Sequence, residues 1–306
     1  MRLIKRWAVA TFILCFLVVI AGGVVRTTQS GMGCPDWPRC FGKWIPPTNA
    51  SELPPDFEKY LSKQDIDHTF NVYHTWIEYF NRLFGVLLGM FAIIQVFLLY
   101  RKRKLFRTAW QLSIGFLIVV VLTGLFGAVV VKFNLAHLSI SVHLFFAVLL
   151  IQIQLAFLLS THEKLSVLFV DDKIKKMLLV FLVLVFVQSI LGTMVRMYVD
   201  DVSRILQYEQ RETWLANSPV AFLIHRSFSW IILAGVIGLA WSGRNSIARK
   251  QFFVLTGIIF LSMLTGITLF YADMPAIAQP VHLLLATLAI TQSISILLQA
   301  KPRRLA

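Results

Sequence analysis

Eight stretches of this chain contain no Asp, Glu, Lys or Arg, and each is close to the length of about 17–25 residues that a helix needs to cross a bilayer. They cover residues 7–25, 83–100, 108–131, 138–161, 177–195, 227–243, 251–272 and 274–300. Backbone polar groups in lipid must be hydrogen-bonded within the protein, and these stretches are too long and too uniformly apolar for barrel strands. The sequence therefore predicts an all-α integral membrane protein with eight transmembrane helices.

The scarcity of charge excludes several classes of soluble protein. Only 14% of the residues are charged and 58% are hydrophobic, whereas a soluble domain has about 25% and about 45–50%. An ordinary soluble enzyme, a disulfide-built secreted module and a disordered chain are all excluded. The first stretch also fits a secretory signal peptide, but its removal would discard a helix that the repeat described below requires.

The net charge of +14 is distributed unevenly along the chain. If the N-terminus is cytoplasmic, the segments on that side carry 18 of the 29 Lys and Arg residues and a net charge of +15, and the other side carries −1. Cytoplasmic segments of membrane proteins are enriched in Lys and Arg. The sequence therefore predicts a multi-pass protein with both termini in the cytoplasm, and the charge gives no reason to expect nucleic acid as a partner.

Short motifs recur in the same order in the two halves of the chain. Residues 22–26 match 192–196, 81–82 match 225–226, 122–124 match 264–266, and His143 matches His282. The last three pairs are 144, 142 and 139 residues apart. Because each half has four spans, both have the same topology. We therefore predict two tandem four-helix halves, 1–165 and 166–306, related by a pseudo-twofold axis along the membrane normal.

Two segments outside the spans are long enough to have structure of their own. The predicted outer loop 26–73 contains six prolines, so it should be irregular with at most a short helix. The segment 199–218 is polar but spaces its apolar residues at nearly helical intervals. We expect this second segment to form an amphipathic helix on the outer surface.

Three histidines, His143, His225 and His282, lie one to two turns inside the outer ends of predicted spans. Ionisable groups at such depth are rare and usually functional, although an interhelical hydrogen bond is the alternative. Two histidines on neighbouring helices of a four-helix unit can hold a planar metallocofactor, of which haem is the leading candidate. His225 and His282 would be the axial pair, and Arg226 would bind a haem propionate or extend to the membrane interface.

The first half departs from this pattern because Asn81, a poor haem ligand, takes the place of His225. His74, Glu78, Asn81 and Arg82 fall within roughly a 100° arc of one helix, so they form a polar stripe. A carboxylate beside a porphyrin can act as a base or stabilise positive charge on a substrate. One half would then keep a permanent haem for electron transfer, and the other would hold a reacting haem near Glu78.

These residues resemble those of the haem A synthase family over essentially all eight spans. The resemblance rests on residues 31–40 (Gly-Met-Gly-Cys-Pro-Asp-Trp-Pro-Arg-Cys), residues 77–82 (Ile-Glu-Tyr-Phe-Asn-Arg) and the three histidines. It implies an oxidoreductase of the bacterial plasma membrane that converts a ring methyl of haem O to a formyl group, through successive hydroxylations, to give haem A for terminal oxidases. It also implies that His225 and His282 bind a haem b cofactor, that the half with Asn81 and His143 receives haem O, and that Glu78 is catalytic.

The sequence departs from the family at two places. Many members have a histidine where Asn81 stands, so the substrate iron would be held by His143 alone or with His74. His74 lies about 10 Å from Asn81 along the helix axis, so the two positions cannot serve one iron in the same pose. Some members carry a second cysteine pair after the span 177–195, and this chain has none there.

Cys34 and Cys40 lie in the predicted outer loop with five residues between them. Because that side of the membrane is oxidising, we predict a disulfide between them. Their spacing does not distinguish a bond that braces the loop from one that exchanges electrons during turnover.

The predicted partners are haem O, a haem O synthase, an unidentified electron acceptor, membrane lipid and, in a homo-oligomer, further copies of the chain. A di-haem cytochrome b electron-transfer subunit is the main alternative function, but two such haems need four axial ligands and Asn81 is a poor one. A transporter is disfavoured because no span is plainly interrupted at its centre.

Overall fold

The computed structural model describes residues 2–61, 69–161 and 168–301, and eight helices in this part are long and apolar enough to cross a membrane. They are α1 (Arg2–Thr27), α3 (Val72–Tyr100), α4 (Arg107–Lys132), α5 (His137–Thr161), α6 (Asp172–Ile205), α7 (Val220–Ser242), α8 (Arg249–Tyr271) and α9 (Ala278–Gln299). The prediction of an all-α, eight-helix integral membrane protein is confirmed. Helix α2 (Glu58–Leu61) is a single turn, and the strands β1 (Leu168–Phe169) and β2 (Ala300–Lys301) form one short parallel pair.

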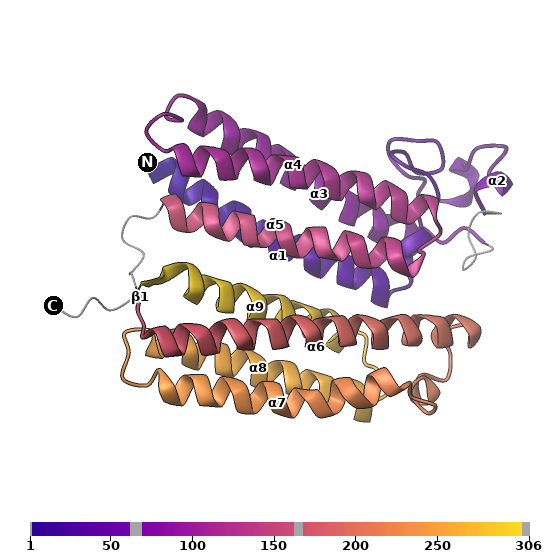
Figure 1. Ribbon diagram of the computed structural model, residues 1–306. Helices are drawn as coiled ribbons and strands as arrows, with labels where there is room; N and C mark the ends of the chain where they lie inside the picture. The colour runs from indigo at the N-terminus through magenta and orange to yellow at the C-terminus, as the bar shows by residue number, and fades with distance from the viewer. Residues whose placement is uncertain (1, 62–68, 162–167, 302–306) are drawn as a thin grey trace. The chain divides into compact units, whose positions relative to one another are not determined.

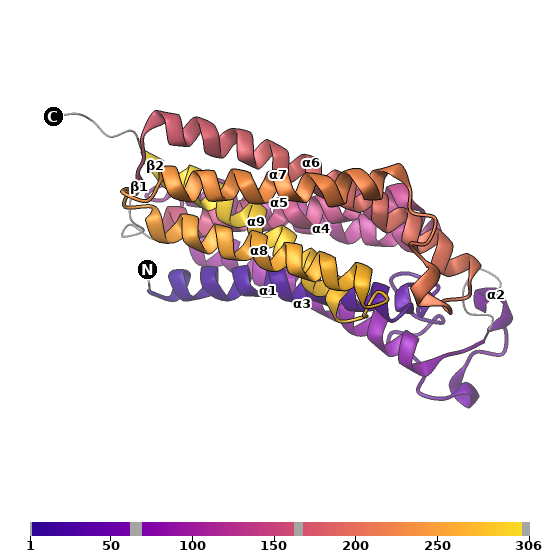
Figure 2. The ribbon, with the colours of Figure 1, turned by 90° about the horizontal axis from the view of Figure 1, so that it is seen from below.

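The chain divides into two compact units, which we call unit 1 (residues 1–162) and unit 2 (residues 163–306). In unit 1, α1 and α4 each pack against both α3 and α5, which closes a four-helix bundle (Figure 1). In unit 2, α6 and α8 each pack against both α7 and α9 (Figure 2). The predicted boundary after residue 165 lies outside the described residues, so that boundary and the pseudo-twofold axis stay predictions.

The interior of unit 1 contains a buried pair of glutamines among apolar side chains. Gln95 on α3 and Gln154 on α5 each donate an amide hydrogen bond of 3.0 Å to the other's oxygen. The Gln154 amide also donates to the carbonyl of Ala8 on α1 at 3.2 Å. Polar side chains buried in a membrane bundle must find partners within the protein, and such bonds contribute about 0.6–2 kcal/mol each. This pair therefore joins three of the four helices of unit 1.

The turns that follow α4 and α8 have the same backbone structure. Asn134 and Leu135 have φ angles of 50° and 59°, and Asp273 and Met274 have φ angles of 57° and 56°. The first turn is closed by a hydrogen bond from Leu135 N to Val130 O, and the second by the equivalent bond from Met274 N to Leu269 O. The turns of the two hairpins, α4–α5 and α8–α9, therefore match residue by residue at an offset of 139.

This offset corrects one of the motif matches made from the sequence. At 139 residues, Gly266 corresponds to Gly127, whereas the match of 122–124 with 264–266 paired it with Gly124. The two offsets differ by three residues, which is close to one helical turn. The motif of residues 122–124 is therefore displaced by about one turn but lies on nearly the same face of its helix.

Helix α3 begins at Val72, eleven residues before the predicted span 83–100. The side chain of Asn71 caps it, because Oδ1 accepts hydrogen bonds from the backbone N–H groups of Tyr73 (3.0 Å) and His74 (3.3 Å). The preceding loop contains short turns of helix at Ser30–Met32, Ala50–Glu52 and α2. Within the described residues it is irregular, as predicted.

The prediction of a separate amphipathic helix over 199–218 is wrong, because α6 continues unbroken to Ile205. The added turns are held by packing: Val199 is buried against Trp214 and Met274. Only a single turn of 3₁₀ helix follows in this segment, at Arg211–Thr213. The apolar spacing that predicted a surface helix therefore belongs in part to the last turns of a transmembrane helix.

Candidate functional site

His225 and His282 face each other inside unit 2. They lie on α7 and α9, which are opposite members of the bundle and not neighbouring ones as predicted, because each packs against both α6 and α8. Their ring centroids are 6.4 Å apart and their ring planes cross at 75°. Metal–imidazole bonds are about 2.0–2.1 Å long, so two rings that ligate one metal from opposite sides have their centroids roughly 6 Å apart. The distance between these two rings fits a pair of axial ligands.

A backbone carbonyl is hydrogen-bonded to Nδ1 of each of the two histidine rings. Nδ1 of His225 lies 3.2 Å from the carbonyl oxygen of Gln188 on α6, and Nδ1 of His282 lies 3.0 Å from that of Ser262 on α8. A carbonyl oxygen only accepts hydrogen bonds, so each Nδ1 carries the hydrogen. Each neutral ring therefore keeps the lone pair of Nε2 for a metal, which is the arrangement typical of metal-binding histidines.

A glycine of a neighbouring helix lies against each site histidine. A Cβ placed on Gly192 would lie 3.2 Å from Cε1 of His225, and one on Gly266 would lie 3.3 Å from Cε1 of His282. In unit 1, the corresponding distance from Gly127 to Cε1 of His143 is 3.6 Å. Gly192 and Gly266 appeared in the repeated motifs, but their contacts with the rings were not recognisable from the sequence. Gly127 was missed because the motif match was three residues out of register.

In unit 1, Asn81 and His143 lie on α3 and α5, the two helices that face each other across the bundle. Asn81 lies beside α1, where a Cβ on Gly22 would be 4.0 Å from its Oδ1. Nδ1 of His143 is buried and has no hydrogen-bond partner in the described part of the chain. The ring of His143 is therefore held less firmly than the two rings of unit 2.

His74 lies in the first turn of α3, seven residues before Asn81. Its backbone packs so closely on Gly33 that no Cβ fits at that position. The start of α3 is thereby pressed against the loop that contains the two cysteines. His74 is placed with this loop, and Asn81 is placed two turns farther along the helix.

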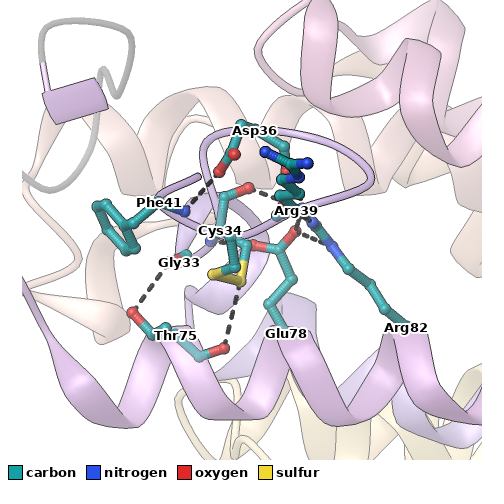
Figure 3. Close-up of polar contacts among 9 residues, drawn as sticks. Gly33, Cys34, Asp36, Arg39, Phe41, Thr75, Glu78 and Arg82 are labelled. Atoms are coloured by element: carbon teal, nitrogen blue, oxygen red, sulfur yellow. Dashed lines mark hydrogen bonds and ion pairs between the residues drawn. A yellow bond between two sulfur atoms is a disulfide. The ribbon is translucent and has the colours of Figure 1, made fainter. Parts of the chain in front are cut away.

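The side chains of Glu78 and Arg82 point from α3 toward residues 33–42, which we call the disulfide loop (Figure 3). Glu78 is only 4% exposed. Its Oε2 accepts a hydrogen bond of 2.7 Å from the backbone N–H of Cys34. Its Oε1 accepts from Nε (3.1 Å) and Nη2 (2.5 Å) of Arg82. Both oxygens of this buried carboxylate therefore have partners, which a buried charge requires.

Arg82 uses its remaining donors to hold the disulfide loop. Its Nη1 donates to the carbonyls of Asp36 (2.7 Å) and Arg39 (2.9 Å), and its Nη2 donates to that of Cys34 (2.7 Å). All three guanidinium nitrogens are thus engaged (Figure 3). The prediction that Arg82 lies at a substrate site stays a prediction, but its hydrogen bonds serve the loop.

Arg226, which stands at the matching place in unit 2, has a different environment. It is exposed, and in the described residues its guanidinium group contacts the ring of Phe222 at 5.8 Å. Its N–H donors are therefore available to an anionic group, unlike those of Arg82.

Within the disulfide loop, Cys34 and Cys40 are joined by a disulfide, which confirms that pairing. The carboxylate of Asp36 accepts hydrogen bonds from the backbone N–H groups of Phe41 (2.6 Å) and Gly42 (2.9 Å). Both of these residues have positive φ angles, 52° and 72°, so the side chain of Asp36 stabilises a tight left-handed turn. Thr75 ties the loop to α3 by donating a 2.9 Å hydrogen bond to Gly33 O. The roles of Asp36 and Thr75 were not predicted from the sequence.

Comparison with known proteins identifies the family. Residues 5–294 match the model of the family described as cytochrome oxidase assembly protein. A protein named heme A synthase from Pelagibacter ubique is 26% identical over 77% of this chain and 78% of its own length. Another from Sphingopyxis alaskensis is 26% identical over 86% of this chain and 82% of its own length. A third, from Halalkalibacterium halodurans, is 30% identical over 52% of this chain and 46% of its own length. The chain belongs to the haem A synthase family of cytochrome oxidase assembly proteins.

Proposed function

We propose that this protein is a haem A synthase that oxidises a ring methyl group of haem O to a formyl group. With oxygen supplied by water, this conversion releases four protons and four electrons, which pass to an acceptor outside the chain. The observation that supports the proposal most is the opposed pair His225 and His282, 6.4 Å apart, in a chain whose relatives are named heme A synthase.

In this proposal unit 2 holds a haem b cofactor. His225 and His282 would hold its iron, since each presents Nε2 while a backbone carbonyl of a neighbouring helix accepts a hydrogen bond from Nδ1. Arg226 would bind a propionate, because its guanidinium group is exposed and, among the described residues, is not committed to another acceptor. The haem, when bound, supplies reversible one-electron transfer. The glycines Gly192 and Gly266 let the two rings lie against the neighbouring helices.

Unit 1 receives haem O in the same proposal. His143 holds the substrate iron from one side, and the amide of Asn81 lies on the opposing helix. Glu78 precedes Asn81 by three residues, or roughly 4.5 Å along the helix axis. Its carboxylate is held in one place by Cys34 N–H and Arg82. A fixed carboxylate at this position stabilises positive charge that develops on the ring substituent or accepts a proton from it.

The experiment that tests the function is expression of the chain with a haem O synthase in a host that makes no haem A, followed by extraction of the pigments. We expect haem A in the extract, and haem O alone when the chain is omitted. Haem O without haem A or a hydroxylated intermediate would reject the enzymatic function. Two equivalents of haem b and no haem A would favour a di-haem electron-transfer subunit.

Replacing Gly266 with alanine should weaken the binding of haem b. The new methyl group would lie about 3.3 Å from Cε1 of His282, so the ring must shift by a few tenths of an ångström. We expect a lower haem b content and an altered absorption spectrum in the purified protein. Gly257→Ala on the same helix is the matched control, because a Cβ there meets nothing within 4 Å. Equal haem content in both variants would contradict the proposed role of Gly266.

A further inference from the structure

The three site histidines differ in what holds Nδ1, and His282 is held most firmly. Its Nδ1 lies 2.9 Å from the hydroxyl oxygen of Thr265 and 3.0 Å from the carbonyl oxygen of Ser262. The hydroxyl of Thr265 also donates a 2.8 Å hydrogen bond to that carbonyl. The hydroxyl proton is therefore directed to Ser262 O, and Nδ1–H is the donor to both oxygens. This triangle holds the ring in the tautomer that leaves Nε2 free.

The hairpin of unit 1 that corresponds to this one lacks the hydroxyl. At the offset of 139 that the two turns define, His282 corresponds to His143 and Thr265 corresponds to Phe126. The ring of Phe126 packs on Phe146, with centroids 4.9 Å apart. The side chain of phenylalanine has no oxygen or nitrogen atom that could accept a hydrogen bond from an imidazole N–H.

His143 also differs from His282 in the surroundings of Nδ1. Its Nδ1 is buried and has no hydrogen-bond partner among the described residues. The backbone of Thr123, which corresponds to Ser262, is near this ring, but no hydrogen bond of ordinary geometry joins them. Neither the tautomer nor the orientation of His143 is fixed in the way that those of His282 are.

We propose that Thr265 is a positioning residue for His282, and that Phe126, which stands at the corresponding position of α4, leaves His143 without such a hydroxyl. This difference distinguishes a site that retains its haem from a site that releases it. The inference rests on the proposed function. It attributes the difference in retention between the cofactor haem and the substrate haem to the residues at positions 265 and 126. A group that binds the far nitrogen of a metal-ligating histidine typically changes metal affinity by about 10–100-fold. An enzyme must keep its cofactor and release its product, so an asymmetry of this size is useful to it.

The test is the rate at which haem b leaves the purified protein for an excess of an apo-haem-binding acceptor protein. Thr265→Val keeps the shape of the side chain and removes the hydroxyl, so we expect release to be about 10-fold faster and the midpoint potential of haem b to shift. Thr265→Ser, which restores the hydroxyl, should return both values toward those of the wild type. Thr268→Val is the matched control, because in the described part of the chain that hydroxyl donates to Leu264 O on its own helix and does not contact a site histidine.

The reciprocal change is made in unit 1. Phe126→Thr should slow the release of haem O or haem A relative to Phe126→Val, since these two variants differ only in a hydroxyl at the position that corresponds to Thr265. Wild-type haem release by Thr265→Val, or equal release by the two Phe126 variants, would overturn the inference. A wild-type protein that contains no haem b would instead reject the proposed function. The two failures are therefore distinguishable.

Discussion

Replacing Glu78 with alanine is expected to reduce the rate at which haem O is converted to haem A by about 100-fold or more. The haem b spectrum should be retained. The carboxylate is buried in unit 1, far in sequence from the proposed ligands His225 and His282 of unit 2. The substitution removes the charge, leaves Cys34 N–H without its acceptor and removes the ion-pair partner of Arg82. The measurement is the ratio of haem A to haem O in pigments extracted after expression with a haem O synthase.

A second variant separates the charge of Glu78 from its structural role. Glu78→Gln keeps an oxygen that can accept from Cys34 N–H, and Thr75 still donates to Gly33 O, so the disulfide loop stays attached to α3. The negative charge and the acceptor of Arg82 are lost. We expect this variant to lose conversion as well. If Glu78→Gln made haem A at the wild-type rate and only Glu78→Ala failed, Glu78 would serve to anchor the loop and would have no part in the chemistry.

Replacing His225 or His282 with alanine is expected to remove haem b from the purified protein. Loss of an axial ligand should reduce affinity by more than the 10–100-fold typical of losing a group that only orients a ligand. The visible spectrum and the extracted haem content measure the effect. His137→Ala is the control, because that residue is the first of α5 in unit 1 and lies outside the proposed ligand pair.

A variant with a different iron ligand distinguishes the loss of a ligand from misfolding of the protein. Methionine is also an axial haem ligand and raises the reduction potential. His282→Met should therefore retain haem b at a higher midpoint potential than the wild type. If His225→Ala and His282→Ala both kept a full complement of haem b, these residues would not be its ligands.

The number and type of the helices were predictable because the length of a charge-free apolar stretch is set by the thickness of the bilayer. Helix ends were less predictable, since local contacts decide them. Asn71 starts α3 eleven residues before the predicted span, and packing of Val199 against Trp214 extends α6 past its predicted end. Neither effect changes the hydropathy of the apolar stretch itself.

The candidate site was predictable to the extent that it consists of ionisable residues at membrane depth. His225 and His282 stood out for that reason, and the structure places their rings opposite each other. The groups that hold Nδ1 were not predictable, because carbonyls occur at every residue and Thr265 is one of several threonines in its helix. The hydrogen bonds of Glu78 and Arg82 to the disulfide loop were not predictable either. They depend on how the loop folds against α3, and the spacing of residues along α3 gives no information about that.

In the proposed division of labour, unit 2 retains haem b and unit 1 binds and converts haem O. The decisive measurement is the pigment content of purified His143→Ala protein, expressed with a haem O synthase and compared with the wild type. We expect this variant to keep haem b in wild-type amount and to lose both haem O and haem A. Loss of haem b from the variant, or continued production of haem A, would contradict it.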